Sequence, residues 1–230
     1  MKEQKNKTYY KRNLPHYQPE GHTFFITFRL AGSLPVAVIK KLKEDRENEL
    51  KLISGIMQQK QKAEKYYESQ RKYFGVFDRL LDSNKSSPMW LKEKEIAEIV
   101  KEAIHYRDEK EYELVAYTIM PNHVHIVFTP KFVSRSEAST TNKTKNEAGA
   151  SFYNVTKILQ DLKSEAALKC NKLLNRSGTF WHHESYDHVV RNIDELGRIV
   201  NYVLQNPVKA GLVENQEEWK WSYYNPKYLV

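Results

Sequence analysis

Two histidines separated by one apolar residue, His123-Val124-His125, carry the clearest chemical signal in the sequence. They begin a run that reads as a strand, in which side chains two positions apart point to the same face. Both imidazoles should therefore project together, while Val124 faces a core on the other side. Neutral imidazoles are good ligands for divalent metal ions. The pair predicts half of a metal site, and the alternative is a pair of histidines with a purely structural role.

A tyrosine and an asparagine lie one helical turn apart later in the chain. Residues 193–205 repeat apolar side chains at helical spacing, and Pro207 and Gly211 are expected to end that helix. Tyr202 and Asn206 should therefore share a face. An amide oxygen can ligate a hard cation, and a phenol can attack an electrophile that the cation holds. Taken alone, the pair is explained as well by a half-buried tyrosine and a helix-ending asparagine, since the chain has 15 tyrosines.

Three other groups of residues compete for a chemical role. Tyr186 and His188 share a strand face, but Tyr186 lacks a ligand partner at helical spacing. His182 and His183 look like metal ligands, yet adjacent strand residues are expected to point to opposite faces, which favours a structural role over DNA contact. Aromatic residues near the C-terminus could stack on unpaired bases, but packing of the tail on the core is favoured; they are Trp219, Trp221, Tyr223 and Tyr224.

The elements that must position these residues alternate along the chain. Strands are expected near 22–30, 112–119, 123–129 and 183–190, and amphipathic helices from Pro35, near 96–104, at 152–173 and at 193–205. Strand, helix, strand, strand, helix and strand in that order make the split βαβ, ferredoxin-like arrangement. The sequence therefore predicts an α+β fold with an antiparallel sheet and a C-terminal helix that carries Tyr202.

Two segments interrupt this order. Residues from about 44 to 90 are rich in charge and read as a solvated helix or helical hairpin inserted into the domain, with a DNA-gripping arm as the less favoured alternative. Residues from about 133 to 150 are rich in Ser, Thr, Asn and Lys and read as a mobile polar loop. The length of 230 residues suits a single domain over 1–230.

Composition favours a polyanionic partner. The net charge of +8 points most simply to nucleic acid. The single cysteine, Cys170, excludes an internal disulfide framework and fits a reducing compartment, and its place in a helix indicates packing. The sequence has no apolar run near the ~20 residues of a membrane span and no signal-peptide pattern at its start. We therefore expect a cytoplasmic protein without a membrane partner.

Together these motifs resemble the single-tyrosine HUH transposases, and most closely the REP-associated tyrosine transposases (RAYTs) of bacteria. The matching stretches occur in the family's order between about residues 13 and 225; they are 22–30, 120–125, 177–181 with 184–188, and 201–211. The resemblance maps the paired metal histidines onto His123 and His125, the nucleophile onto Tyr202 and the third ligand onto Asn206. The ligands are expected at a surface site. The insertion and the polar loop depart from compact members, which leaves both a monomer and a homodimer open.

The resemblance implies cleavage and rejoining of single-stranded DNA at REP-type hairpins. Mg²⁺ or Mn²⁺ would polarise the scissile phosphate, and Tyr202 would form a 5′-phosphotyrosine link. Two alternatives stay open: a non-cleaving hairpin DNA- or RNA-binding protein on the same scaffold, and a small metal-dependent phosphodiesterase that uses only the histidines. The candidate DNA contacts are Arg12, Arg29, Lys157 and Lys163.

Overall fold

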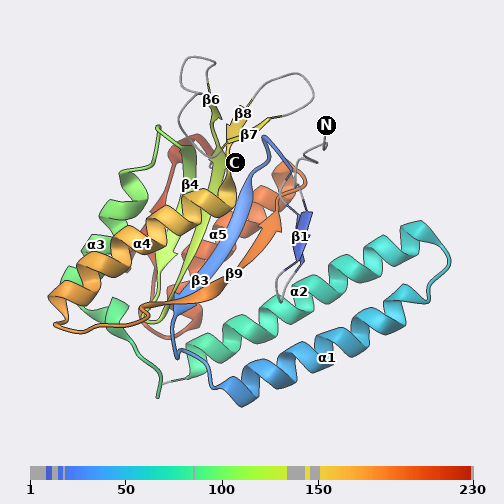
Figure 1. The fold of residues 1–230 in the computed structure, drawn as a ribbon, viewed down its shortest axis with the longest axis horizontal. Helices are drawn as coiled ribbons and strands as arrows, with labels where there is room; N and C mark the ends of the chain where they lie inside the picture. Colours follow the sequence, from blue (N-terminus) through green and yellow to red (C-terminus); the bar gives the residue numbers. More distant parts are fainter. Residues whose placement is uncertain are drawn as a thin grey trace, which may run out of the picture.

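The computed structural model describes residues 9–11, 15–17, 19–84, 86–133, 143–145 and 151–228 (Figure 1). Its helices are α1 (Val36–Ser54), α2 (Gln59–Ser83), α3 (Lys94–His105), α4 (Val155–Leu173) and α5 (Ile193–Lys209). Its strands are β1 (Tyr9–Lys11), β2 (Pro15–Tyr17), β3 (Phe24–Leu30), β4 (Tyr112–Ile119), β5 (His123–Pro130), β6 (Phe132–Val133), β7 (Lys143–Lys145), β8 (Ser151–Tyr153), β9 (Trp181–Val189) and β10 (Ser222–Tyr224). Short 3-10 turns occur at Trp90–Lys92, Gln216–Glu218 and Pro226–Tyr228.

The main sheet has five strands in the order β10-β4-β5-β3-β9, and each neighbouring pair is antiparallel. β3 and β4 therefore run in the same direction with β5 between them, which is the split βαβ arrangement. This confirms the α+β fold class with an antiparallel sheet. The sequence did not predict β10, which adds the C-terminal tail to the β4 edge and brings Trp221 into the core.

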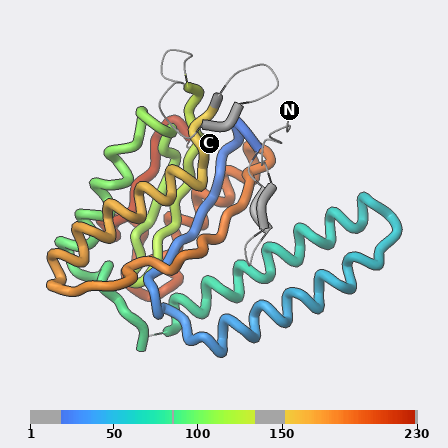
Figure 2. Tube along the Cα trace, in the orientation of Figure 1, coloured from blue at the N-terminus to red at the C-terminus, as the bar shows by residue number. Residues whose placement is uncertain are grey.

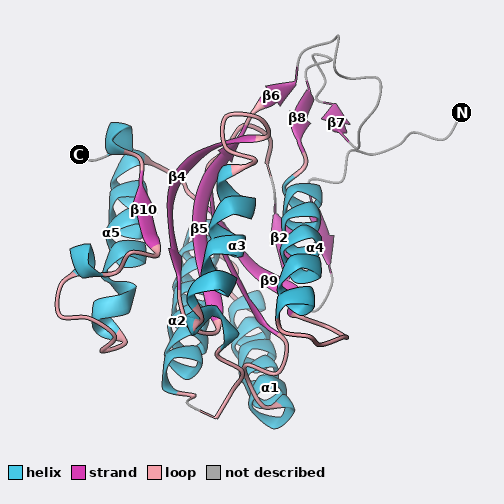
Figure 3. Ribbon diagram, turned by 90° about the vertical axis from the view of Figure 1, so that its left-hand side faces the viewer, coloured by secondary structure: helices cyan, strands magenta, loops and turns pink. Residues whose placement is uncertain are grey.

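Alternation along the central strands divides the core into two layers. Val124 and Ile126 of β5 point to the face that α3 and α4 cover, and Val127 points to the face that α5 covers. Figure 3 shows α5 on one side of the strands and α4 on the other. Because His123 and His125 alternate with Val124, both imidazoles lie on the α5 face.

The α1–α2 hairpin leaves the sheet after β3 and returns along α2 (Figure 2). The insertion expected near 44–90 falls on this hairpin, which begins earlier, at Val36. The expectation of a solvated segment holds for the first half of α2, where most of residues 59–68 are exposed, and is wrong for its second half, where Phe74 packs into the α5 core. Just after the helix, Asn84 Nδ2 donates to the Ser33 carbonyl at 2.8 Å. One face of α2 is thus covered by the body of the protein.

The C-terminal helix α5 is longer than the sequence indicated. α5 continues through Pro207 to Lys209. Pro207 has no N–H to donate to the Val203 carbonyl, and its ring crowds that carbonyl. The helix nevertheless runs two residues further, so the expectation that Pro207 ends it is wrong. The chain leaves the helix just before Gly211, whose φ of +67° lies in the left-handed region that favours glycine. Tyr202 and Asn206 therefore lie in one uninterrupted helix.

Three further expectations concern the polar loop, Cys170 and membrane spans. The loop expected near 133–150 lies mostly outside the described residues, although Lys143–Lys145 within it forms β7. Cys170 is fully buried in α4, as packing requires. Within the described part of the chain, no helix has both the length and the apolar character of a membrane span.

Candidate metal centre and nucleophile

His123 and His125 lie side by side on β5, fully buried, with their Nε2 atoms 3.1 Å apart. Asn122 fixes the proton on the first of them. Its Nδ2 donates to the Leu81 carbonyl at 2.9 Å and to Ser87 Oγ at 3.1 Å, so its Oδ1 accepts from His123 Nδ1 at 2.6 Å. Burial, followed by the neighbouring His125, lowers the pKa of His123 to about 3. His123 is thus neutral, with a lone pair on Nε2.

The second histidine is oriented by β3. Thr27 lies opposite His125 in the strand register, and its Oγ1 is 2.7 Å from His125 Nδ1. A hydrogen bond at the other ring nitrogen is the usual way in which a protein aligns a metal-ligating histidine. Both Nε2 atoms are therefore turned toward the same point.

An aspartate from α2 reaches this point. Asp78 Oδ1 is 3.2 Å from His125 Nε2 and 3.7 Å from His123 Nε2. Asp82, one turn later, has its Oδ1 4.0 Å from His123 Nε2. Burial would raise the pKa of Asp78, but the two histidines and a hydrogen bond from Tyr202 lower it below its ordinary value. Burial and the neighbouring Asp78 raise the pKa of Asp82 to about 7.

Tyr202 and Asn206 approach the same carboxylate from α5. The Tyr202 hydroxyl donates to Asp78 Oδ2, and Asn206 Nδ2 donates to the same oxygen at 3.1 Å. The Tyr202 ring lies 5.8 Å from the His125 ring and 6.1 Å from the Phe25 ring, centroid to centroid. Burial and the Asp78 charge raise the pKa of Tyr202, which holds the phenol in its protonated form. The structure thus brings together all four residues that the resemblance singled out.

The donor set of this cluster fits a divalent metal ion. Three buried oxygens have no hydrogen-bond donor among the described residues: Asp78 Oδ1, Asp82 Oδ1 and Asn206 Oδ1. Buried acceptors without a donor are costly, and a cation would satisfy them. Neighbouring ligands about 2.1 Å from an octahedral ion lie about 3 Å apart, close to the 3.1 and 3.2 Å separations seen here. The ligand atoms of Asp78, His123 and His125 lie within 4.8 Å of one another.

The histidines do not lie at the surface, contrary to expectation. Both are 0% exposed, because α2 and α5 cover the β5 strand that carries them. A cavity of about 330 Å³ adjoins the cluster beside Asp82 and Asn122, and Lys92 and Met120 also line it.

Asp78 and Asp82 lie in a segment whose sequence reads as charged and solvated, and for that reason neither was a predicted site residue. One signal was present. Asp78 falls four residues after Phe74 and three before Leu81, both of which are buried, so the aspartate interrupts the apolar stripe of its helix. A carboxylate at such a position must find a buried partner.

The competing tyrosine has a different environment. Tyr186 is 8% exposed, and its ring stacks on Phe74 with a centroid separation of 4.5 Å. The expectation that His182 and His183 point to opposite faces is wrong, because their ring centroids are 4.5 Å apart. The β3–β9 register shifts at this point, and such a bulge breaks the alternation of side chains.

The candidate DNA contacts are not gathered at one place. Arg12 lies outside the described residues. Arg29 is 3% exposed and donates to Ser33 Oγ at 2.9 Å, and burial lowers its pKa to about 10. Lys157 pairs with Asp161 one turn along α4. Their contact with DNA stays a prediction.

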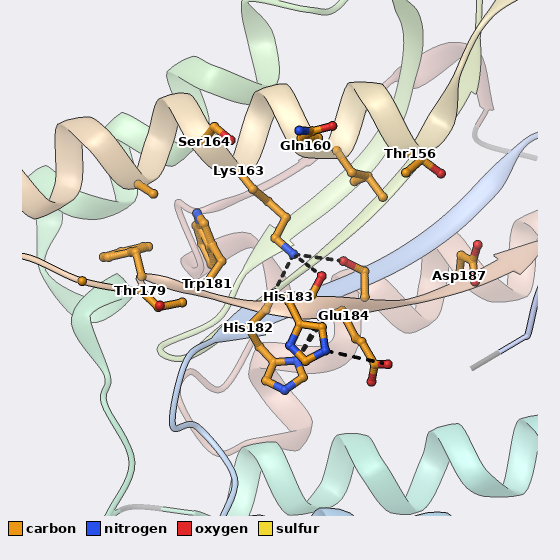
Figure 4. A pocket seen from close by; sticks show the side chains of 15 residues that line it. Thr156, Gln160, Lys163, Ser164, Thr179, Trp181, His182, His183, Glu184 and Asp187 are labelled. Atoms are coloured by element: carbon orange, nitrogen blue, oxygen red, sulfur yellow. Dashed lines mark hydrogen bonds and ion pairs between the residues drawn. The ribbon is translucent and has the colours of Figure 1, made fainter. Parts of the chain in front are cut away.

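Lys163 reaches from α4 to the edge strand β9 (Figure 4). Its Nζ donates to the His182 carbonyl at 2.7 Å, beside a cavity of about 480 Å³ that Gln160, Thr179 and Trp181 also line. The amine thus caps the free edge of β9, which is a structural task. A role for Lys163 in DNA binding also stays a prediction.

Comparison with known proteins gives two related findings. A protein of Haemophilus influenzae named as a REP-associated tyrosine transposase is 25% identical over 115 residues, which are 50% of this chain and 60% of the relative. A solved structure of a REP-associated tyrosine transposase bound to a REP hairpin superposes with a TM-score of 0.50 at 16% identity, over 93% of this chain and 80% of the other. The resemblance to the RAYTs is confirmed. The structural match shows that the fold is shared with a RAYT, and no protein-family model matches the chain.

Proposed function

We propose that this protein cleaves and rejoins single-stranded DNA at REP-type hairpins, with Tyr202 as nucleophile and a divalent metal ion as cofactor. The carrying observation is that the Tyr202 hydroxyl and the Asn206 amide meet the paired histidines of β5 through one carboxylate. The RAYT solved with a REP hairpin supports the choice of partner.

In this proposal Tyr202 performs the covalent chemistry. Its oxygen attacks the phosphorus, the bond to the 3′ oxygen breaks, the phenolic proton passes to a nearby acceptor, and a 5′-phosphotyrosine and a 3′-OH result. A phosphodiester is exchanged and not hydrolysed, so the reverse attack by a 3′-OH rejoins DNA without a nucleotide cofactor. His123, His125 and Asn206 would hold Mg²⁺ or Mn²⁺, which supplies positive charge at the scissile phosphate and favours the leaving 3′-OH.

The test is capture of the covalent adduct. Labelled DNA with a hairpin and unpaired flanks is incubated with Mn²⁺ and the protein, and the products are separated on a denaturing gel. Tyr202→Phe removes one oxygen and little volume, so it should bind DNA but form no adduct. Tyr186→Phe, the matched control, should form the adduct at the wild-type level. Peptide mapping of the adduct to Tyr186, or an adduct in Tyr202→Phe, contradicts the assignment.

The same labelled DNA, run on both denaturing and native gels, separates the hairpin-binding and phosphodiesterase alternatives. A non-cleaving hairpin-binding protein would shift the DNA on a native gel and yield neither adduct nor cleaved strand. A phosphodiesterase that uses only the histidines would cleave in the Tyr202→Phe variant.

A further inference from the structure

We propose that Asp78 belongs to the metal centre, as a ligand through Oδ1 and as the residue that positions Tyr202 and Asn206 through Oδ2. The inference rests on the proposed function and adds to it a residue from the α1–α2 hairpin, outside the elements that carry the histidines and the tyrosine. It makes the hairpin part of the active site.

Asp78 Oδ1 lies in surroundings that favour a bound cation. The side chain is 4% exposed, and this oxygen has no hydrogen-bond donor among the described residues. It lies 3.2 Å from the Nε2 of His125 and 3.7 Å from the Nε2 of His123, whose own lone pair points the same way. A buried carboxylate oxygen beside the lone pair of His123 is unfavourable without a positive charge. A divalent cation shared by the three atoms removes that cost, and carboxylate oxygen is a preferred ligand of Mg²⁺ and Mn²⁺.

Asp78 Oδ2 accepts hydrogen bonds from two residues of α5, Tyr202 and Asn206. Because Asn206 Nδ2 is used to donate to this oxygen, the amide is turned so that its Oδ1 is left free. That oxygen is the atom that could ligate a metal. The same carboxylate oxygen accepts from the Tyr202 hydroxyl, so it sets the direction of the nucleophile and is placed to receive its proton. Asp78 therefore aligns a ligand and the nucleophile at once.

Hydrogen bonds to the rest of the protein hold α2 on both sides of Asp78. The Leu81 carbonyl accepts from Asn122, the residue that also orients His123. Nearer the start of α2, the Tyr67 hydroxyl donates to Glu195 of α5. The Asp78 carboxylate is thus placed by packing and hydrogen bonds that do not involve the metal, as a preorganised ligand requires.

A blocking role for Asp78 would change metal affinity in the opposite direction from a ligand role. If the Asp78 carboxylate merely filled the space of the scissile phosphate, it would block the site, and its removal would leave metal affinity unchanged or improve it. Ligation predicts a loss of affinity. Mn²⁺ binding by the DNA-free protein distinguishes the two without any measurement of cleavage.

The experiment compares Mn²⁺ binding to wild type, Asp78→Asn and Glu64→Gln, by electron paramagnetic resonance of free Mn²⁺ and by calorimetry. Glu64 is an exposed carboxylate on the same helix, so its variant controls for the loss of one negative charge. We expect Asp78→Asn to bind Mn²⁺ at least about tenfold more weakly, since ligand charge tunes such affinities, and Glu64→Gln to match wild type. The rise in melting temperature that Mn²⁺ gives should shrink in parallel.

A second variant covers the case in which Asp78→Asn does not fold. In Asp78→Cys a thiolate replaces the carboxylate, so selectivity should move from Mn²⁺ toward Cd²⁺ relative to wild type. Unchanged or tighter Mn²⁺ binding by Asp78→Asn, or unchanged selectivity in Asp78→Cys, overturns the inference and leaves the proposed function standing. Failure of wild type to bind Mn²⁺ overturns both the inference and the metal dependence of the proposed function, whereas the Tyr202 adduct is judged separately.

Discussion

Two asparagines of the cluster are oriented by the hydrogen bonds that their amide nitrogens donate. Asn122 gives its amide nitrogen to the Leu81 carbonyl, and Asn206 gives its own to the Asp78 carboxylate. Each therefore turns its oxygen to the position where it is used, toward His123 Nδ1 in one case and into the cluster in the other. At the scale of single residues, the hydrogen bonds donated by the two amide nitrogens fix the direction of the two amide oxygens.

Removal of either histidine tests the centre directly. His123→Ala and His125→Ala should each abolish Mn²⁺-dependent cleavage, whereas Asn206→Ala should retain part of it, because water can replace one amide oxygen on the ion. Both histidines are fully buried, so each substitution should also lower the free energy of unfolding by roughly 1–3 kcal/mol through a partner left unpaired. Cleavage assays over a range of Mn²⁺ concentrations, with urea unfolding of each variant, check both effects. Full activity of either histidine variant at low Mn²⁺ would contradict the metal assignment.

At the scale of elements, Glu195 joins the α1–α2 hairpin to α5. It accepts from Tyr67 of α2, from the backbone N–H of Arg191 at 2.8 Å and from the Arg191 side chain at 3.1 Å. The Arg191 guanidinium also stacks on the Tyr67 ring, 3.4 Å from its centroid. Burial would raise the pKa of Glu195, but the hydrogen bonds from Arg191 and Tyr67 lower it to about 2.

The lowered pKa of Glu195 gives the stability of the protein a definite acid dependence. The folded state favours the ionised form, so this contribution is complete above about pH 4.5, the ordinary value, and is lost as pH falls toward 2. Glu195→Gln should lower the free energy of unfolding by about 1–3 kcal/mol at pH 7, and the difference from wild type should shrink between pH 4.5 and 3. Urea unfolding at several pH values measures this. A difference that stays constant with pH would rule out the ionised Glu195 as its source.

The sequence predicted most elements and four of the residues that meet in the cluster, because alternation and helical periodicity are local properties. The spacing of His123 and His125 placed both on one strand face, and the spacing of Tyr202 and Asn206 placed both on one helix face. Asp78 could not be placed in this way, since its approach to His125 depends on how α2 packs against β5. The burial of the histidines was missed for the same reason. The bulge at His182 also depends on the pairing of β9 with β3.

At the scale of the whole molecule, the net charge of +8 favours contact with the phosphates of DNA. Hairpins with unpaired flanks should bind more tightly than blunt duplex of equal length, because unpaired bases offer faces for stacking. Affinity for both should fall as salt rises from about 50 to 200 mM, since phosphate contacts release counterions.

Lys157→Gln should reduce the salt slope by about one if Lys157 contacts a phosphate. Fluorescence anisotropy measures all three, and equal affinity for hairpin and blunt duplex would speak against hairpin recognition.

The turn between α1 and α2 has one further consequence. Residues 55–58 connect the helices at the end far from the sheet (Figure 1), where Met57 is 94% exposed. α1 continues from β3 at its other end, α2 is fixed there by Asn122, and Ser69 Oγ donates to Glu49 Oε2 at 2.8 Å between them. A protease nick in this turn, or new chain ends placed there by circular permutation, should leave both helices docked. The cluster of His123, His125, Asp78 and Tyr202 is then assembled from two segments of chain whose covalent connection at this point is dispensable.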